Sequence, residues 1–150
     1  MTLQVGDLAP DFEVKNQHGE PVKLSDFQGQ KVVLYFYPKD DTSGCTAQAC
    51  NLRDNYEALQ KNGYKVLGVS VDNEKKHQKF ITKYELPFTL LADTEHEIVE
   101  KYNVWQEKSM YGRKYMGTMR YTFIIDENGK IVDIITKVDT KNHAAQILKN

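Results

Sequence analysis

The chain has only two cysteines in 150 residues. Small secreted domains that are held together by disulfides need more, whereas a chain of this length can bury roughly 68–70% of its unfolded surface without them. In a reducing cytosol two cysteines are thiols at rest, and such a pair is more often catalytic or metal-binding than structural. We therefore expect one domain over residues 1–150, and we treat both cysteines as candidates for chemistry.

The chain also lacks a dominant charge, a long apolar run and a leader. Its net charge of -1 gives no reason to expect nucleic acid or an anionic membrane as a partner. No apolar run approaches the roughly 20 residues that span a bilayer. The segment Met1–Asp7 has neither the basic start nor the apolar core of a secretory signal. These absences predict a cytoplasmic protein that binds no nucleic acid and no membrane.

The four histidines do not form a metal-binding pattern. His18, His77, His96 and His143 are scattered along the chain, and we expect each to be an ordinary surface residue. Two thiols without a neighbouring histidine pair make a poor zinc site. We therefore expect neither a metal nor an organic cofactor.

Strand-like and helix-like segments alternate, which predicts an α/β protein with a mixed sheet. The expected strands are 12–14 and 22–24 as a hairpin, Lys31–Tyr37, Tyr64–Val71, Thr89–Leu91, and Met119–Asp126 with Lys130–Thr136 around a two-residue turn at Asn128-Gly129. Helices are expected over 45–62, across 80–84 after a cap at 72 or 73, across 98–102, and after 139–140. Asn103–Gly117 is expected to be a long polar connection.

The surroundings of Cys45 make it the most informative residue. An apolar run over 32–37 stops at Pro38, a short polar loop follows, and a helical pattern begins near Cys45. A thiol in the first turn of a helix faces unpaired backbone N–H groups and the positive end of the helix dipole. Both favour the thiolate, which is the reactive form. Cys45 is therefore expected to be a nucleophile rather than the small buried hydrophobe that a free cysteine usually is.

This stretch resembles the active-site motif of peroxiredoxins, Pro-x-x-x-Thr-x-x-Cys, which is met by Pro38, Thr42 and Cys45. The resemblance is closest to the peroxiredoxin Q or bacterioferritin comigratory protein subfamily. It covers nearly the whole chain, with further matches at 6–12, at 114–117 and from Arg120 to 125–126. It implies a thioredoxin-like fold, with a central mixed β-sheet flanked by helices and an extra N-terminal β-hairpin. The residue pattern alone reaches only an α/β protein with a mixed sheet.

The resemblance also implies roles for the motif residues. Cys45 would attack a peroxide and become a sulfenic acid, while Thr42 would hydrogen-bond the thiolate and a peroxide oxygen. Pro38 would cover the thiolate, and Arg120 would stabilise both the thiolate and the departing oxygen. The alternatives are a simple helix N-cap for Thr42, loop geometry for Pro38 and a surface charge for Arg120. Ser43 stands where the family usually has Pro, and it can compete as the N-cap.

Several nearby residues are weaker candidates. Arg53 and Arg113 could supply charge to the site. Gln48 falls where many relatives carry Glu, and it is expected either to orient the loop or to be an exposed helix residue. The segment Lys39-Asp40-Asp41 is expected to be a solvated turn.

Cys50 lies five positions after Cys45. In a regular helix such positions are about 8.6 Å apart, and their side chains point about 140° apart. A disulfide needs a Cα separation below about 7 Å, so the bond cannot form while the helix stays regular. The resemblance implies an intramolecular Cys45–Cys50 disulfide, which requires the first helical turns to unwind. The alternative is that Cys50 is a bystander.

The function that the resemblance implies is a thiol-dependent peroxidase for hydrogen peroxide and small alkyl hydroperoxides. It would be monomeric, recycled by thioredoxin, and used in antioxidant defence. Two alternatives stay open: a non-enzymatic redox module whose disulfide is sensed by a partner, and a general thiol–disulfide oxidoreductase. The absence of a Cys-x-x-Cys motif counts against the last of these.

Overall fold

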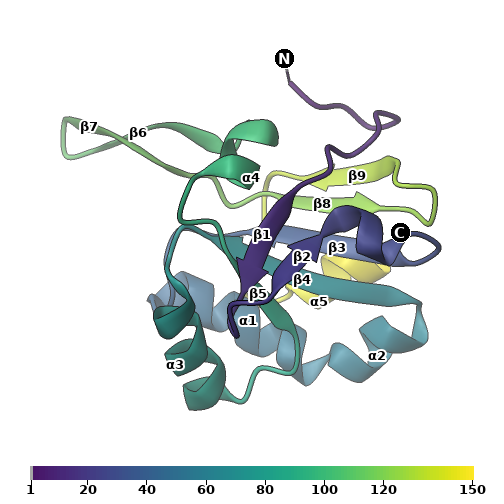
Figure 1. Ribbon diagram of the computed structural model, residues 1–150. Coiled ribbons are helices and arrows are strands. Elements are labelled where there is room, and N and C mark those ends of the chain that lie inside the picture. Colours follow the sequence, from purple (N-terminus) through teal and green to yellow (C-terminus); the bar gives the residue numbers. More distant parts are fainter. Residues whose placement is uncertain (1) are drawn as a thin grey trace.

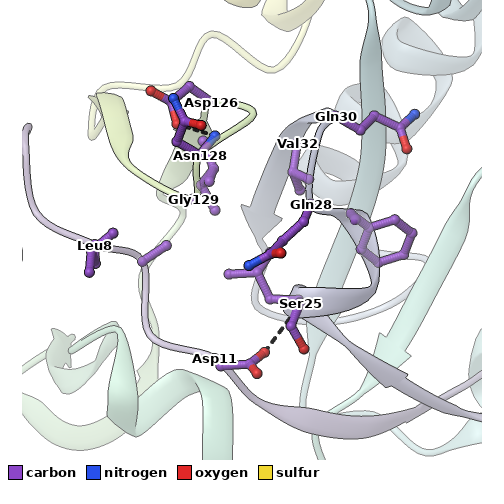
Figure 2. Close-up of a pocket in the computed structure, with 13 residues that line it drawn as sticks. Leu8, Asp11, Ser25, Gln28, Gln30, Val32, Asp126, Asn128 and Gly129 are labelled. Atoms are coloured by element: carbon purple, nitrogen blue, oxygen red, sulfur yellow. Dashed lines mark hydrogen bonds between the residues drawn. The ribbon is translucent and has the colours of Figure 1, made fainter.

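A seven-stranded mixed sheet is the framework of the computed structural model, which describes residues 2–150 (Figure 1). The strand order is β2-β1-β5-β4-β3-β8-β9, in which β3, β4 and β5 are parallel and the other neighbours are antiparallel. The bounds are β1 Glu13–Asn16, β2 Pro21–Lys23, β3 Lys31–Phe36, β4 Tyr64–Ser70, β5 Thr89–Ala92, β8 Thr122–Ile125 and β9 Ile131–Ile135. The predicted mixed sheet and N-terminal hairpin are therefore confirmed. Because strands from both halves of the chain share this sheet, we propose the single domain predicted over residues 1–150, of which Met1 lies outside the described residues.

Helices cover both faces of the sheet (Figure 1). One face carries α1 (Ser43–Asp54), α2 (Tyr56–Lys61), α3 (Glu74–Tyr84) and α5 (His143–Leu148). The other face carries α4 (Glu97–Lys101) and the short 3-10 helix η1 (Leu24–Phe27). The central strand β3 is buried on both sides because Val33 and Tyr35 face the first layer while Leu34 and Phe36 face the second. Among residues 2–150, no helix is long and apolar enough to cross a membrane.

The prediction of one helix over residues 45–62 is wrong at its centre. The segment divides at Asn55 into α1 and α2. The Asn55 backbone leaves the helical region at φ -112° and ψ 15°, and its side-chain amide donates to the Asn51 carbonyl at 2.8 Å. A short polar side chain that competes for backbone groups in this way favours a helix boundary. The apolar spacing continued across the break because both helices pack on the same face of the sheet.

The long polar connection expected at Asn103–Gly117 is a second hairpin, made of β6 (Trp105–Met110) and β7 (Arg113–Thr118). It forms a separate two-stranded sheet that projects from the body of the molecule (Figure 1). Because it projects, most of its side chains are exposed and the apolar–polar alternation of a half-buried strand is missing. Its turn is Tyr111-Gly112, with both residues at positive φ (52° and 78°), rather than the Asn-Gly pair that usually signals such a hairpin.

The turn predicted at Asn128-Gly129 is present, but its loop has three residues instead of two. The Gly129 amide donates to the Asp126 carbonyl at 3.1 Å, and the Asp126 amide donates to the Lys130 carbonyl at 2.8 Å. Gly129 has φ 80°, the left-handed conformation that glycine adopts without strain. Such a loop, a turn followed by a left-handed residue, is the second commonest way to join two antiparallel strands.

Candidate active site

Cys45 lies at the third position of α1, where the sequence pattern placed it. The helix begins at Ser43 after Thr42, whose extended backbone (φ -94°, ψ 159°) is that of an N-cap residue. The thiol is only 2% exposed and packs in the core layer that contains Tyr35 and Ala49. Backbone N–H groups in the first turn of a helix lack partners within the helix, so they point their positive ends toward this part of the site.

Arg120 is brought to Cys45 by sheet topology. It lies in the short connection between β7 and β8, and β8 pairs with β3, the strand that leads to the Cys45 loop. Its Nη1 donates to the Cys45 Sγ at 3.4 Å and to the Gln48 Oε1 at 2.8 Å. A Cβ at Gly44 would come within 3.1 Å of the Arg120 Nη2, so glycine lets the guanidinium approach the start of the helix. The alternative of a plain surface charge does not fit this geometry.

Gln48 is fully buried, so the expectation that it could be an exposed helix residue is wrong. Its carbonyl oxygen holds the Arg120 guanidinium, while its Nε2 has no hydrogen-bond partner within the described part of the chain. The hydroxyl of Tyr35 is likewise buried without a partner there. Burial, and then the nearby charge of Cys45, raise the pKa of the Tyr35 phenol well above its ordinary value, so this hydroxyl keeps its proton. Two buried side-chain donors near Cys45 and Arg120 therefore lack a hydrogen-bond partner within residues 2–150.

The loop before the helix places the other motif residues. The Thr42 hydroxyl donates to the Lys39 carbonyl at 2.9 Å and makes no side-chain capping bond. Its one proton is thereby used, and its oxygen stays available as an acceptor. Thr42 is the N-cap, and Ser43 is the first residue of the helix. Proline is also favoured at this first helical position. Pro38 is half-buried, two residues after the end of β3.

Both cysteines are free thiols within the unbroken helix α1. Cys45 is buried and Cys50 is half-buried. Because the helix is continuous from Ser43 to Asp54, the geometric argument against a bond in this state applies directly. The structure is therefore that of a reduced, helical form.

Neither of the two weaker arginine candidates reaches the thiol. Arg53 bonds Asp54 and the Tyr84 carbonyl, and Arg113 is exposed on the projecting hairpin. The structure instead brings to the neighbourhood of Arg120 a cation that the sequence reasoning missed. Lys108 of β6 is half-buried, and its Nζ donates to the Thr118 carbonyl at 2.5 Å, two residues before Arg120. This contact sets a second cation beside the segment that carries Arg120. Burial, and then the charge of Arg120, lower the pKa of Lys108.

Two histidines contradict the expectation of ordinary surface residues. His77 and His143 are both fully buried, whereas His18 is exposed and His96 is half-buried. The signal was present at His77, because His77, Phe80, Ile81 and Tyr84 recur at helical spacing on one apolar face. Asp40 was expected in a solvated turn, yet only 9% of it is exposed because its carboxylate meets His77. Within residues 2–150 no group of three or more histidine, cysteine or acidic residues is arranged to hold a metal.

Comparison with known proteins places the chain in a large family. The model described as the AhpC/TSA family matches residues 5–134. The chain is 48% identical over 149 residues to Peroxiredoxin Bcp of Bacillus subtilis, covering 99% of this chain and 95% of that protein. It is 49% identical over 146 residues to Peroxiredoxin Bcp of Escherichia coli, covering 97% and 94%.

Solved structures agree with these relatives. The Xanthomonas campestris bacterioferritin comigratory protein, whose structures bear on its alkyl peroxide reduction activity, superposes with a TM-score of 0.86. It is 33% identical, and the match covers 92% of this chain and 88% of that one. The predicted thioredoxin-like fold is therefore confirmed.

Proposed function

The chain belongs to the AhpC/TSA family and is a peroxiredoxin of the Bcp and peroxiredoxin Q type, a thiol-dependent peroxidase; from this premise we propose that Cys45 is its peroxide-reducing residue. The observation that carries the proposal is the 3.4 Å contact between the Arg120 guanidinium and the Cys45 Sγ at the start of α1. The substrates we propose are hydrogen peroxide and small alkyl hydroperoxides, in line with the alkyl peroxide reduction activity of the Xanthomonas campestris relative.

The first step is a displacement at oxygen. The Cys45 thiolate attacks the terminal oxygen of the hydroperoxide, an S–O bond forms, and the O–O bond breaks. The leaving hydroxide or alkoxide takes up a proton, and Cys45 becomes a sulfenic acid. Because charge moves from sulfur to the leaving oxygen, fixed positive groups that face both atoms stabilise the transition state.

Arg120 is the group we assign to that stabilisation. Its planar fork offers several N–H donors, of which Nη1 already faces the thiol. Gln48 restrains the guanidinium, so little reorganisation is needed when charge develops. Thr42 would accept a hydrogen bond from the O–H of the bound hydroperoxide, because its own hydrogen is donated to the Lys39 carbonyl. Pro38, which has no N–H to compete, would shield the thiolate from water.

Cys50 is the residue we assign to resolution. Its thiol would condense with the Cys45 sulfenic acid, forming the disulfide and releasing water. Since the two residues lie in one continuous helix, the turns between them must unwind first. An external dithiol would then reduce the disulfide, and we propose thioredoxin for this role.

The wider setting is also proposed. We infer an antioxidant role as a monomer, in which each chain carries both cysteines of the cycle. A cytoplasmic location fits the same chemistry, because a reducing compartment returns both residues to thiols between turnovers.

Peroxide consumption in the presence of thioredoxin, thioredoxin reductase and NADPH tests the proposal. Wild-type protein is expected to turn over, and Cys45→Ser is expected to lose turnover entirely because serine cannot supply a thiolate. Circular dichroism of the variant controls for folding. Substantial turnover by Cys45→Ser would refute the assignment of the nucleophile, whereas stoichiometric oxidation of wild type without turnover would point to a redox module or to another reductant.

A further inference from the structure

A buried polar cluster beneath the Pro38–Thr42 loop takes no part in the chemistry described above. Asp40, in the middle of this loop, is 9% exposed, and His77 of α3 is 0% exposed. The His77 Nδ1 lies 2.6 Å from the Asp40 Oδ2, and the Tyr37 hydroxyl lies 2.5 Å from the Asp40 Oδ1. A buried acid and a buried histidine on adjacent elements are costly to desolvate, so their retention calls for a physical reason.

Geometry assigns most of the protons in this cluster. The His77 Nε2 lies 2.9 Å from the Leu91 carbonyl oxygen, which can only accept, so Nε2 carries a hydrogen. Burial, and then the charge of Asp40, raise the pKa of the Tyr37 phenol well above its ordinary value, so Tyr37 donates to Asp40. The remaining proton lies between His77 and Asp40, and both Asp40 oxygens are thereby bonded.

These bonds fasten the loop to elements other than α1. His77 belongs to α3, and Leu91 belongs to β5. The Asp40 backbone amide also donates to the Asp72 Oδ2 at 2.8 Å, and Asp72 follows β4. None of these partners lies in the helix whose first turns the proposed disulfide must unwind. The middle of the loop is therefore held independently of that helix.

We propose that Asp40 and His77 form a positioning pair that fixes the Pro38–Thr42 loop on α3 and β5, so that the Thr42 oxygen is correctly placed when peroxide reaches Cys45. The inference rests on the proposed function. The pair acts through the backbone between Asp40 and Thr42 and touches no reacting atom. It also gives the chain a fixed point from which α1 can rewind after each reduction.

The proposal depends on hydrogen bonding and not on a net charge at Asp40. Asp40→Asn keeps both contacts, because its carbonyl oxygen accepts from Tyr37 and its amide donates to the Nδ1 of a neutral His77. Asp40→Ala removes both contacts and leaves buried polar groups without partners. Asn matches Asp in shape and removes only the charge, whereas Ala removes the hydrogen bonds as well, so the two variants separate loop positioning from the loss of a charge.

The decisive measurement is the second-order rate of Cys45 oxidation by hydrogen peroxide, followed by stopped flow at a temperature where every variant is folded. Asp40→Ala is expected to be at least tenfold slower, and Asp40→Asn to stay within threefold of wild type. Asp41, in the same loop, is exposed and bonds Lys83 and the Tyr84 hydroxyl of α3. Asp41→Asn removes its charge but keeps an acceptor for Tyr84, so it is the matched control and is expected to change the rate less than twofold. Equal rates for Asp40→Ala and wild type, or an equal loss in Asp40→Asn and Asp40→Ala, would overturn the pair.

Amide hydrogen exchange of the wild type keeps the proposal testable if Asp40→Ala fails to fold. The Asp40 amide is expected to stay protected after oxidation, while amides over 43–50 lose protection. Loss of protection at Asp40 together with α1 would overturn the inference. If wild-type Cys45 does not react with peroxide at all, the proposed function fails; if it reacts but the variants show no difference, only the positioning pair fails.

Discussion

The two halves of α1 are held in the protein in different ways. In the first half, residues 43–50, Cys45 and Gln48 accept hydrogen bonds from the Arg120 side chain beside the helix. In the second half, residues 51–54, Asn51 bonds α5 and Arg53 bonds the end of α3. The contrast shows where unwinding can stop, because the anchored half begins at the residue after Cys50.

Asn51 is the clearest of these anchors. Its Nδ2 donates to the Lys141 carbonyl at 2.8 Å, and its Oδ1 accepts from the Ala144 amide at 2.8 Å. One side chain thus satisfies both a loop carbonyl and a first-turn amide of α5, so it ties two helices together. We infer that the helical turns that must open for a Cys45–Cys50 bond are those without such ties.

The largest expected effect comes from removing the thiol at the junction of the two halves. Cys50→Ser is expected to leave the first oxidation of Cys45 intact, because the Arg120 side chain bonds Cys45 and Gln48 and not Cys50. Thioredoxin-supported turnover should be abolished or strongly slowed, and Cys45 should over-oxidise more readily. Mass spectrometry of the peroxide-treated variant should show a sulfenic acid where the wild type shows a disulfide.

Hydrogen exchange over residues 42–54 in both redox states completes this test. The oxidised wild type should lose protection in the first half of α1 and keep it in the second. An oxidised wild type without the Cys45–Cys50 bond, or with unchanged exchange, would make Cys50 a bystander and assign resolution to an outside thiol.

Next in size is the loss of the guanidinium that faces the first half. Arg120→Lys should lower the second-order rate with peroxide by about thirty-fold, about 2 kcal/mol in transition-state stabilisation, because a point charge cannot bond Cys45, Gln48 and peroxide together. Arg113→Lys, on the exposed hairpin, is the matched control and should react like the wild type. Stopped-flow rates that are unchanged in Arg120→Lys would remove Arg120 from the mechanism.

A smaller effect, on the free energy of unfolding, is expected when Asn51, which anchors the second half of α1, is replaced. Asn51→Ala removes both bonds to the α5 region and should lower the free energy of unfolding by about 1–3 kcal/mol. In the oxidised variant, the loss of exchange protection should extend past position 51. Gln60→Ala, at an exposed position on α2, serves as the control in denaturant titrations. An oxidised variant that still opens only as far as position 50 would show that Asn51 is not the boundary.

The smallest expected effect is on how the free energy of unfolding depends on pH, through His143 at the start of α5. Burial, and then the charge of Arg120, lower the pKa of His143, which donates from Nδ1 to Gln146 and accepts from Thr122 at Nε2. The unfolded chain then binds this proton at a higher pH than the folded one, so stability should fall as pH drops below about 6.5 and level off below the folded pKa. One group can contribute at most about 1.4 kcal/mol per pH unit. Thermal melts of wild type and His143→Gln should diverge in this window; parallel pH profiles would contradict the assignment.

Local patterns in the chain anticipated the reactive half of the molecule well. Apolar runs identified the strands, including β3, because a strand buried on both faces needs an unbroken apolar sequence. The change from strand to Pro38 to helical spacing placed Cys45 in the first turn of α1. These features depend on neighbours in sequence, so they are legible without a structure. The projecting hairpin was missed for the converse reason, since exposed strands carry no burial pattern.

By itself the sequence determined that a thiol lies at the start of a helix that follows a buried central strand, because both features are encoded by periodicity and by Pro38. The residue pattern alone left Arg120 a plausible surface charge and left Asp40 and His77 as solvated residues. Tertiary structure decided otherwise: pairing of β8 with β3 brings Arg120 across 75 positions to Cys45, and packing of α3 beneath the loop brings His77 across 37 positions to Asp40. The reason is physical. Periodicity reports which face of an element is buried, but the partner of a buried polar group is set by the order of strands and the placing of helices.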